Sequence, residues 1–206
     1  MIALKETFYT LLNRYTINNE LIEELWDEIE IAYSGQQRYY HSLTHLENLL
    51  AQLEAIAAQL QNWDVILFSL YYHDIIYSAT QSNNEEKSAE LAENRMLKAG
   101  IPLAIIKECK EQILATKSHV VSNNHDTNYF TDADLSILGQ DWDSYAAYFK
   151  SVRKEYQIFP NLIYKVGRKK VLKHFLTMPR IYKTAYFYEK LESKARENLQ
   201  KEIDLL

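Results

Sequence analysis

Residues 63–77, WDVILFSLYYHDIIY, decide the fold. Their side chains are apolar on nearly every side, which is typical of a helix buried all round at the centre of a protein. One polar pair, His73 and Asp74, interrupts the stretch near its C-terminal end. We therefore predict a central buried helix over residues 63–77 that carries a carboxylate into apolar surroundings.

Helical periodicity continues on both sides of this stretch. Leucines between Leu43 and Leu60 recur at intervals of three, four and seven residues. Asn84 precedes an acidic first turn in a segment that ends at Gly100, so we expect it to cap a helix there. Pro102 then suits the first turn of the next helix. Further helical patterns cover residues 2–15, 19–33, 141–157, 161–177 and 184–203.

The composition also favours helices. Only four glycines and three prolines occur among 206 residues, whereas short strands joined by tight turns need many of both. We find no alternation of apolar and polar residues, no internal repeat and no linker rich in Gly, Pro or Ser. We therefore predict an all-α fold in a single domain over residues 1–206, with the polar residues 118–128 in a loop.

Charge and cysteine content limit the classes of partner. The net charge of −5 gives no global attraction to phosphate backbones, so we expect no nucleic-acid partner. Cys109 is the one cysteine and forms no internal disulfide. We see no signal peptide, and the apolar run at residues 65–72 is too short to span a bilayer. These features predict a cytoplasmic protein without a membrane partner; a homodimer stays open.

The buried carboxylate of Asp74 requires compensation, because an ionised group taken out of water is costly unless it is paired. No Lys or Arg lies within a helical turn of it in the sequence. The adjacent imidazole of His73 makes a metal ion the plausible cation. Alternatively, Asp74 bonds a remote side chain or meets water at the helix end. The second His-Asp pair, His125 and Asp126, lies in the polar stretch, where we expect both side chains to be solvated.

Two other segments supply similar groups. His41 and His45 stand four residues apart, on one face if both are helical. Asp132 and Asp134 flank an alanine before a short apolar run, a pattern that also suits helix capping. A mixed imidazole and carboxylate set suits a divalent ion with open positions for water and substrate. Four residues make up such a set in this chain: His45, His73, Asp74 and Asp134.

The order His, His-Asp, Asp resembles the HD superfamily of metal-dependent phosphohydrolases, all-α proteins named for that dipeptide. The chain is most similar to a bacterial subgroup of predicted HD phosphohydrolases with RxYHN-like, HD-(I/V)-(I/V)-Y, NE-x-x-SA, DADLSxLG, vRxEY and ARxNLxxE motifs. In this sequence the motifs stand at Arg38–His41, His73–Tyr77, Asn84–Ala89, Asp132–Gly139, Val152–Tyr156 and Ala195–Glu202.

The resemblance implies an HD-domain-like helical bundle. Its metal-binding core would cover about residues 38–139, and a C-terminal helical part would cover residues 140–206. It also implies that the first metal ion is held by four ligands, with Asp132 in reserve for the last of them: His45, His73, Asp74 and Asp134.

The opening of the core also resembles the YHNxxHAxxV motif of the cyclic nucleotide phosphodiesterases. In that motif the first histidine donates a proton to the leaving oxygen and the second binds metal, which makes His41 a candidate general acid and His45 a ligand. This sequence has Ser42 where the motif has Asn, and Leu46 replaces its small residue. A supporting or capping role for His41 is the alternative.

Two more residues gain candidate roles from related HD proteins. His119 ends a helical pattern and is a candidate for a second metal ion or a substrate phosphate, unless it is simply a solvated helix end. Glu85 is a candidate for orienting or deprotonating the attacking water. The alternative for Glu85 is an acidic first turn that complements the helix dipole.

A basic segment offers candidates for binding phosphate. No acidic residue lies between Tyr156 and Tyr188, whereas seven Lys and Arg residues do. We predict Arg168 as a contact to substrate phosphate, although a solvated helix face or a patch for nucleic acid remains open. Arg38, just before the candidate acid, is a second predicted phosphate contact.

We therefore expect an enzyme, a metal-dependent phosphoric ester hydrolase acting on a phosphorylated small molecule such as a nucleotide. Its cofactor would be one or two divalent ions from the set Mn²⁺, Mg²⁺, Ni²⁺, Co²⁺ and Fe²⁺. One alternative is an HD-fold di-iron oxidoreductase that acts on a small molecule. The other is a non-catalytic, nucleotide-binding HD module.

Overall fold

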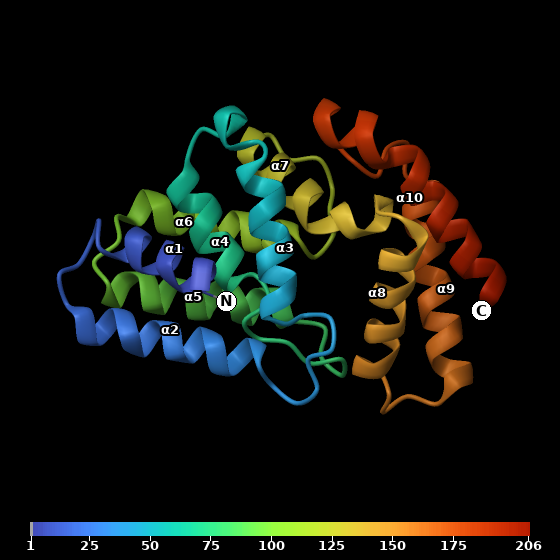
Figure 1. The fold of residues 1–206 in the computed structure, drawn as a ribbon, viewed down its shortest axis with the longest axis horizontal. Coiled ribbons are helices and arrows are strands. Elements are labelled where there is room, and N and C mark those ends of the chain that lie inside the picture. Colours follow the sequence, from blue (N-terminus) through green and yellow to red (C-terminus); the bar gives the residue numbers. More distant parts are fainter. Residues whose placement is uncertain (1) are drawn as a thin grey trace. The chain divides into compact units, whose positions relative to one another are not determined.

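The computed structural model describes residues 2–206, which form ten α-helices, two 3₁₀ helices and no strand (Figure 1). The predicted all-α fold is thereby confirmed. The helices group into two compact units, one that ends at Thr131 and one that covers Asp132–Leu206. A single domain stays a prediction. Among residues 2–206, no helix combines the length and hydropathy that a membrane span requires.

The first unit is built around α4 (Trp63–Tyr72), whose residues from Val65 onward are all buried. This confirms the predicted central helix, which ends five residues earlier than expected, with His73 as its C-cap. Four helices pack against α4: α1 (Ile2–Leu12), α3 (Leu43–Glu54), α5 (Asn84–Lys98) and α6 (Leu103–Ala115). The unit also contains α2 (Asn19–Tyr33), which packs on α1, and η1 (Ala57–Gln59).

The start of α5 differs from the prediction. Asn83, not Asn84, occupies the N-cap position. The Asn84 side chain instead holds the preceding loop, because its Oδ1 accepts from Ser78 N at 3.2 Å and its Nδ2 donates to Ser78 O at 3.0 Å. Asn84 thus fixes the chain segment that follows the His-Asp turn.

The predicted loop at residues 118–128 contains the start of a helix, α7 (His125–Asp134). Asp126 is 4% exposed, so the expectation of a solvated carboxylate is wrong. Its Oδ2 accepts the backbone N–H groups of Gln61 at 2.9 Å and Asn62 at 2.7 Å. Asn62 in turn caps α4, so Asp126 supports the start of the helix whose C-cap is His73.

The second unit contains η2 (Leu135–Gly139), α8 (Trp142–Glu155), α9 (Asn161–Thr177) and α10 (Ala185–Leu205). Both η2 and α9 pack against α10. At Gly139 a Cβ atom would lie 2.5 Å from the Cβ of Leu191, so the close approach of η2 to α10 needs glycine there.

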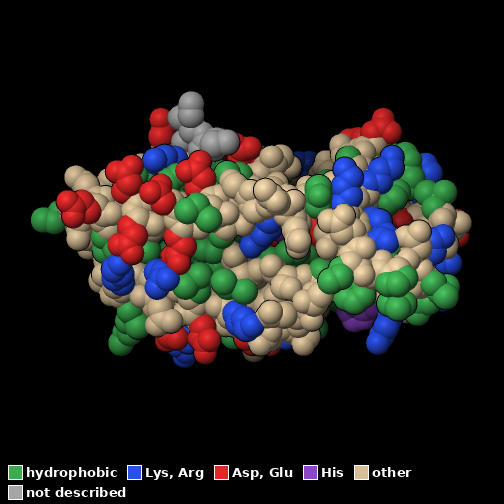
Figure 2. Space-filling model, turned by 90° about the horizontal axis from the view of Figure 1, so that it is seen from below, with side chains coloured by type: hydrophobic (Ala, Val, Ile, Leu, Met, Phe, Trp, Pro, Cys, Tyr) green, Lys and Arg blue, Asp and Glu red, His purple; other side chains and the backbone are tan. Residues whose placement is uncertain are grey.

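The two units carry opposite net charges. The first has eighteen Asp and Glu against nine Lys and Arg, and the second has ten against fourteen. On the face seen in Figure 2, acidic side chains are frequent over the first unit and basic side chains over the second. The acidic balance of the whole chain therefore comes from the first unit alone.

Candidate metal centre

Three predicted ligands come together at the C-terminal end of α4. His45 lies in the first turn of α3, His73 caps α4, and Asp74 follows in the next turn. The Nε2 atoms of His45 and His73 are 3.2 Å apart. Asp74 Oδ2 lies 3.2 Å from Nε2 of His73 and 4.0 Å from Nε2 of His45. These side chains form a cluster of the kind that holds a metal ion.

The spacing of these donor atoms fits a divalent ion. Edges of 3.2, 3.2 and 4.0 Å define a triangle with a point about 2.0–2.1 Å from all three corners, which matches metal–nitrogen and metal–oxygen bond lengths. Three donors from imidazole and carboxylate groups leave coordination positions open for water or substrate. The donor set and its spacing therefore both fit a bound divalent ion.

The ring of His73 is held in one orientation. Its Nδ1 donates to the carbonyl oxygen of Leu70 at 3.0 Å, and the side chain is 1% exposed. Because a carbonyl only accepts, the hydrogen lies on Nδ1 and the lone pair of Nε2 faces His45 and Asp74. Such a backbone partner is the usual support for a metal-binding histidine.

Histidines, not Lys or Arg side chains, compensate the Asp74 carboxylate. Burial by itself raises the pKa of Asp74, but the imidazoles of His73, His41 and His45 carry positive charge when they are protonated, and this charge outweighs burial and holds the pKa well below its ordinary value. The side chain retains 18% exposure. A divalent ion held by Asp74, His73 and His45 would supply this positive charge in place of the protons, because histidine ligands must be neutral.

His41 borders the three ligands without joining α3. It precedes Ser42, the N-cap of that helix, so the expectation that it shares a helical face with His45 is wrong. Its Nε2 nevertheless lies 3.9 Å from Asp74 Oδ2, and its ring is 4.1 Å from the ring of Tyr77. With 20% of its side chain exposed, His41 is more open than His45 or His73.

The ring contact of Tyr77 was missed by the sequence reasoning. Tyr77 is the last residue of the HD-(I/V)-(I/V)-Y motif, and its place in that motif could have indicated that it lies near the site. Tyr40, whose ring centroid is 5.0 Å from those of both His41 and His45, is the second aromatic neighbour. Two tyrosine rings thus lie against the candidate acid.

Arg38 donates to three backbone carbonyl oxygens around the centre, those of His41, Asp74 and Ile75. Its guanidinium also lies over the rings of Tyr33 and Tyr77. These contacts indicate that Arg38 holds the site together. Its predicted contact to phosphate stays a prediction.

Glu85 and His119 also belong to the first unit, and their roles stay predictions. Glu85 stands in the first turn of α5, 3.9 Å from Lys117 Nζ, and Lys117 also bonds Glu86 and Ser82 O. This arrangement fits the alternative of an acidic first turn. His119 has a φ of 52°, a left-handed conformation that is uncommon for residues other than glycine.

The remaining candidates belong to the second unit. Arg168 is buried, and its Nε and Nη2 donate to the carboxylate of Glu202 at 2.7 and 2.9 Å. This bidentate pair gives Arg168 a structural role, and its predicted contact to substrate phosphate stays a prediction. The alternative of a solvated helix face does not hold for Arg168, which is buried.

Asp132 and Asp134, the two aspartates considered for the last ligand position, differ in what the structure shows of them. Asp132 is fully buried and accepts the backbone N–H groups of Lys183 and Thr184 at the start of α10, so its oxygens already hold structural partners. Asp134 is the last residue of α7. Its role as fourth ligand stays a prediction.

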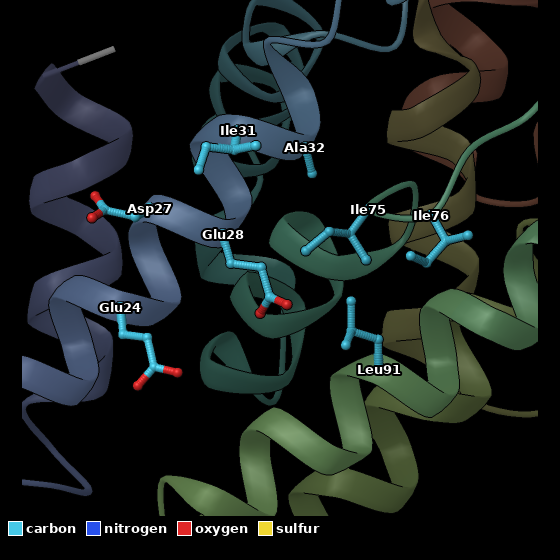
Figure 3. Close-up of a pocket in the computed structure, with 8 residues that line it drawn as sticks. All are labelled: Glu24, Asp27, Glu28, Ile31, Ala32, Ile75, Ile76 and Leu91. Atoms are coloured by element: carbon cyan, nitrogen blue, oxygen red, sulfur yellow. The ribbon is translucent and has the colours of Figure 1, made fainter.

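A groove of about 530 Å³ lies behind the His-Asp turn, between α2 and α5 (Figure 3). Ile75, Ile76 and Leu91 gather at one end of it, and Glu24 and Asp27 lie at the other. None of the three clustered ligands lines this groove. Ile75 and Ile76 directly follow Asp74, so one segment of the chain contributes residues to both the groove and the candidate metal centre.

The chain matches no protein-family model, no curated protein and no solved structure.

Proposed function

We propose that this chain is a metal-dependent phosphohydrolase that cleaves a phosphate ester of a nucleotide. The observation that carries the proposal is the convergence of His45, His73 and Asp74, whose donor atoms are spaced to ligate one divalent ion. The nucleotide follows from the resemblance to the HD superfamily. Asp134 is the proposed fourth ligand.

Each side chain has a stated task in this proposal. His45 and His73 present Nε2 as ligands, and the Leu70 carbonyl keeps His73 in the required tautomer. Asp74 stays ionised and supplies the ligand charge. A bound divalent ion would supply Lewis-acid polarisation and lower the pKa of water. His41, partly exposed beside Asp74, would hold a proton for the leaving oxygen.

Calorimetric titration with Mn²⁺, Mg²⁺, Co²⁺, Ni²⁺ and Fe²⁺ tests the metal centre, and a panel of phosphate monoesters, phosphodiesters and nucleotides tests turnover. We expect Asp74→Ala to abolish metal binding and hydrolysis together. His125→Ala alters the other His-Asp pair, whose histidine is half exposed, and should change neither. Retention of binding and turnover in Asp74→Ala would refute the assignment, as would a wild-type protein that hydrolyses no substrate with any of these ions.

The role of His41 requires a substrate comparison. A p-nitrophenyl leaving group departs without a proton, whereas a sugar alkoxide needs one. His41→Ala should therefore keep its metal affinity and lose about 10²–10⁴-fold in rate on a nucleotide, with a much smaller loss on a p-nitrophenyl ester. Equal losses on both substrates would show that His41 is no general acid.

A further inference from the structure

Arg38 connects two segments that are far apart in the sequence. Its Nη1 donates to the carbonyl oxygens of Asp74 at 2.6 Å and His41 at 3.2 Å, and its Nη2 donates to that of Ile75 at 2.8 Å. The side chain of Arg38 therefore bonds the backbone of both His41, the candidate acid, and Asp74, a candidate ligand.

The carbonyls that Arg38 binds lack helical partners. Helix α4 ends at Tyr72, so the carbonyl groups of Asp74 and Ile75 lie beyond the helix and are not bonded within it. Carbonyl groups beyond a helix end need donors from elsewhere, and a guanidinium offers several in one plane. Arg38 thus fixes the turn that presents His73 and Asp74.

Aromatic rings fix the guanidinium in turn. Its central carbon lies 5.0 Å from the ring centroid of Tyr33 and 5.3 Å from that of Tyr77. The Tyr33 hydroxyl accepts the backbone N–H of Asp74 at 3.2 Å, and the Tyr77 ring lies against His41. Both rings therefore contact the residues that Arg38 itself bonds, since Tyr33 bonds Asp74 and Tyr77 packs on His41.

We propose that Arg38 is a positioning residue that sets the geometry of the metal centre by clamping the His41 segment onto the His-Asp turn. This inference rests on the proposed metal centre and goes beyond it, because it has Arg38 act on the metal ligands through the backbone. A lysine keeps the charge but lacks the planar fork and the stacking surface, so it does not replace Arg38.

The test uses the full chain and Co²⁺ ions, whose visible absorption reports coordination geometry. In Arg38→Lys we expect Co²⁺ affinity to fall about 10- to 100-fold, the usual effect of losing a group that supports metal ligands, and the absorption bands to shift. Arg95→Lys is the matched control, since Arg95 makes a bidentate pair with Glu28, a side chain rather than the turn. It should bind Co²⁺ as the wild type does.

Rescue separates positioning from general loss of stability. Millimolar methylguanidinium should restore Co²⁺ affinity and spectrum to Arg38→Ala and should leave Arg95→Ala unchanged. If Arg38→Ala does not fold, Arg38→Gln serves in the same comparison.

Wild-type affinity and spectrum in Arg38→Lys would overturn the clamp while leaving the metal centre in place. A wild-type protein that binds no Co²⁺ would overturn both.

Discussion

Cys109 is the only thiol of the chain and is fully buried. Burial raises the pKa of this thiol to about 12. Because the thiolate is the reactive form, we expect a disulfide reagent such as DTNB to leave the native protein unmodified at pH 8. In urea the same reagent should titrate one thiol per chain. Rapid reaction of the native protein would contradict the buried position.

Single residues show where sequence reasoning is sufficient and where it stops. The cluster of His45, His73 and Asp74 was predictable, because a buried carboxylate needs compensation and the order of His and His-Asp resembles the ligand pattern of the HD superfamily. The partner of Arg168 was not, because Glu202 lies 34 positions away and nothing in the local pattern separates a buried arginine from a solvated one. The same limit applies to Arg38, whose acceptors at residues 74 and 75 are backbone atoms that carry no sequence signature.

Two glycines on different elements give a matched pair of substitutions. In Gly139→Ala the new methyl group would meet the Cβ, O and Cα atoms of Leu191 within 3.0 Å, so we expect overpacking to cost about 1–3 kcal/mol of unfolding free energy. Gly167 lies within α9, and no atom lies within 4 Å of a Cβ placed there. Gly167→Ala should stabilise the protein by about 0.5–1 kcal/mol. Urea unfolding measures both; destabilisation by Gly167→Ala or none by Gly139→Ala would contradict the packing.

The start of α8 should give the protein a measurable response to acid. Asp141 is its N-cap, and the backbone N–H and hydroxyl of Ser144 hold the pKa of this carboxyl below its ordinary 3.8. A lowered carboxyl pKa contributes stability above the unfolded-state value, and this stability is lost as the pH falls through the folded-state value. We expect the melting temperature of Asp141→Ala to lie below that of the wild type at pH 7 and the difference to shrink below about pH 4.

A neutral cap is the control for this response. Asn also accepts hydrogen bonds at an N-cap but does not titrate in this range. Asp141→Asn should therefore keep most of the wild-type stability at pH 7. A difference between wild type and Asp141→Ala that stays constant down to pH 2 would show that the carboxylate charge plays no part.

Helices whose bounds depend on local sequence were predicted correctly, whereas those whose bounds depend on long-range contacts were not. The bounds of α2 and α9 match the predicted residues 19–33 and 161–177, because apolar spacing and flanking breakers define them locally. Helix α7 was missed because its sequence is polar, and its buried Asp126 finds partners at residues 61 and 62. Helix α4 was predicted too long because the turn after it is held by Arg38, 36 positions earlier in the chain.

For the whole molecule, ligand binding and stability are linked. An ion that binds the folded chain alone raises its unfolding free energy, by about 2.7 kcal/mol when its free concentration is 100 times the dissociation constant. We expect Mn²⁺ or Co²⁺ to raise the melting temperature of the wild type and chelation to reverse the effect. Asp74→Ala should melt at one temperature with or without the ion. An equal rise in both proteins would indicate binding outside the proposed centre.

Two buried aspartates on α7 tie this helix to distant parts of the chain. Asp126 receives N–H groups from Gln61 and Asn62 within the first unit, and Asp132 receives those of Lys183 and Thr184 within the second. Each carboxylate accepts two backbone N–H groups in a buried position, so a longer or an apolar side chain would leave those groups without their partner. In homologous genes both positions should therefore stay Asp even where the rest of the sequence has diverged.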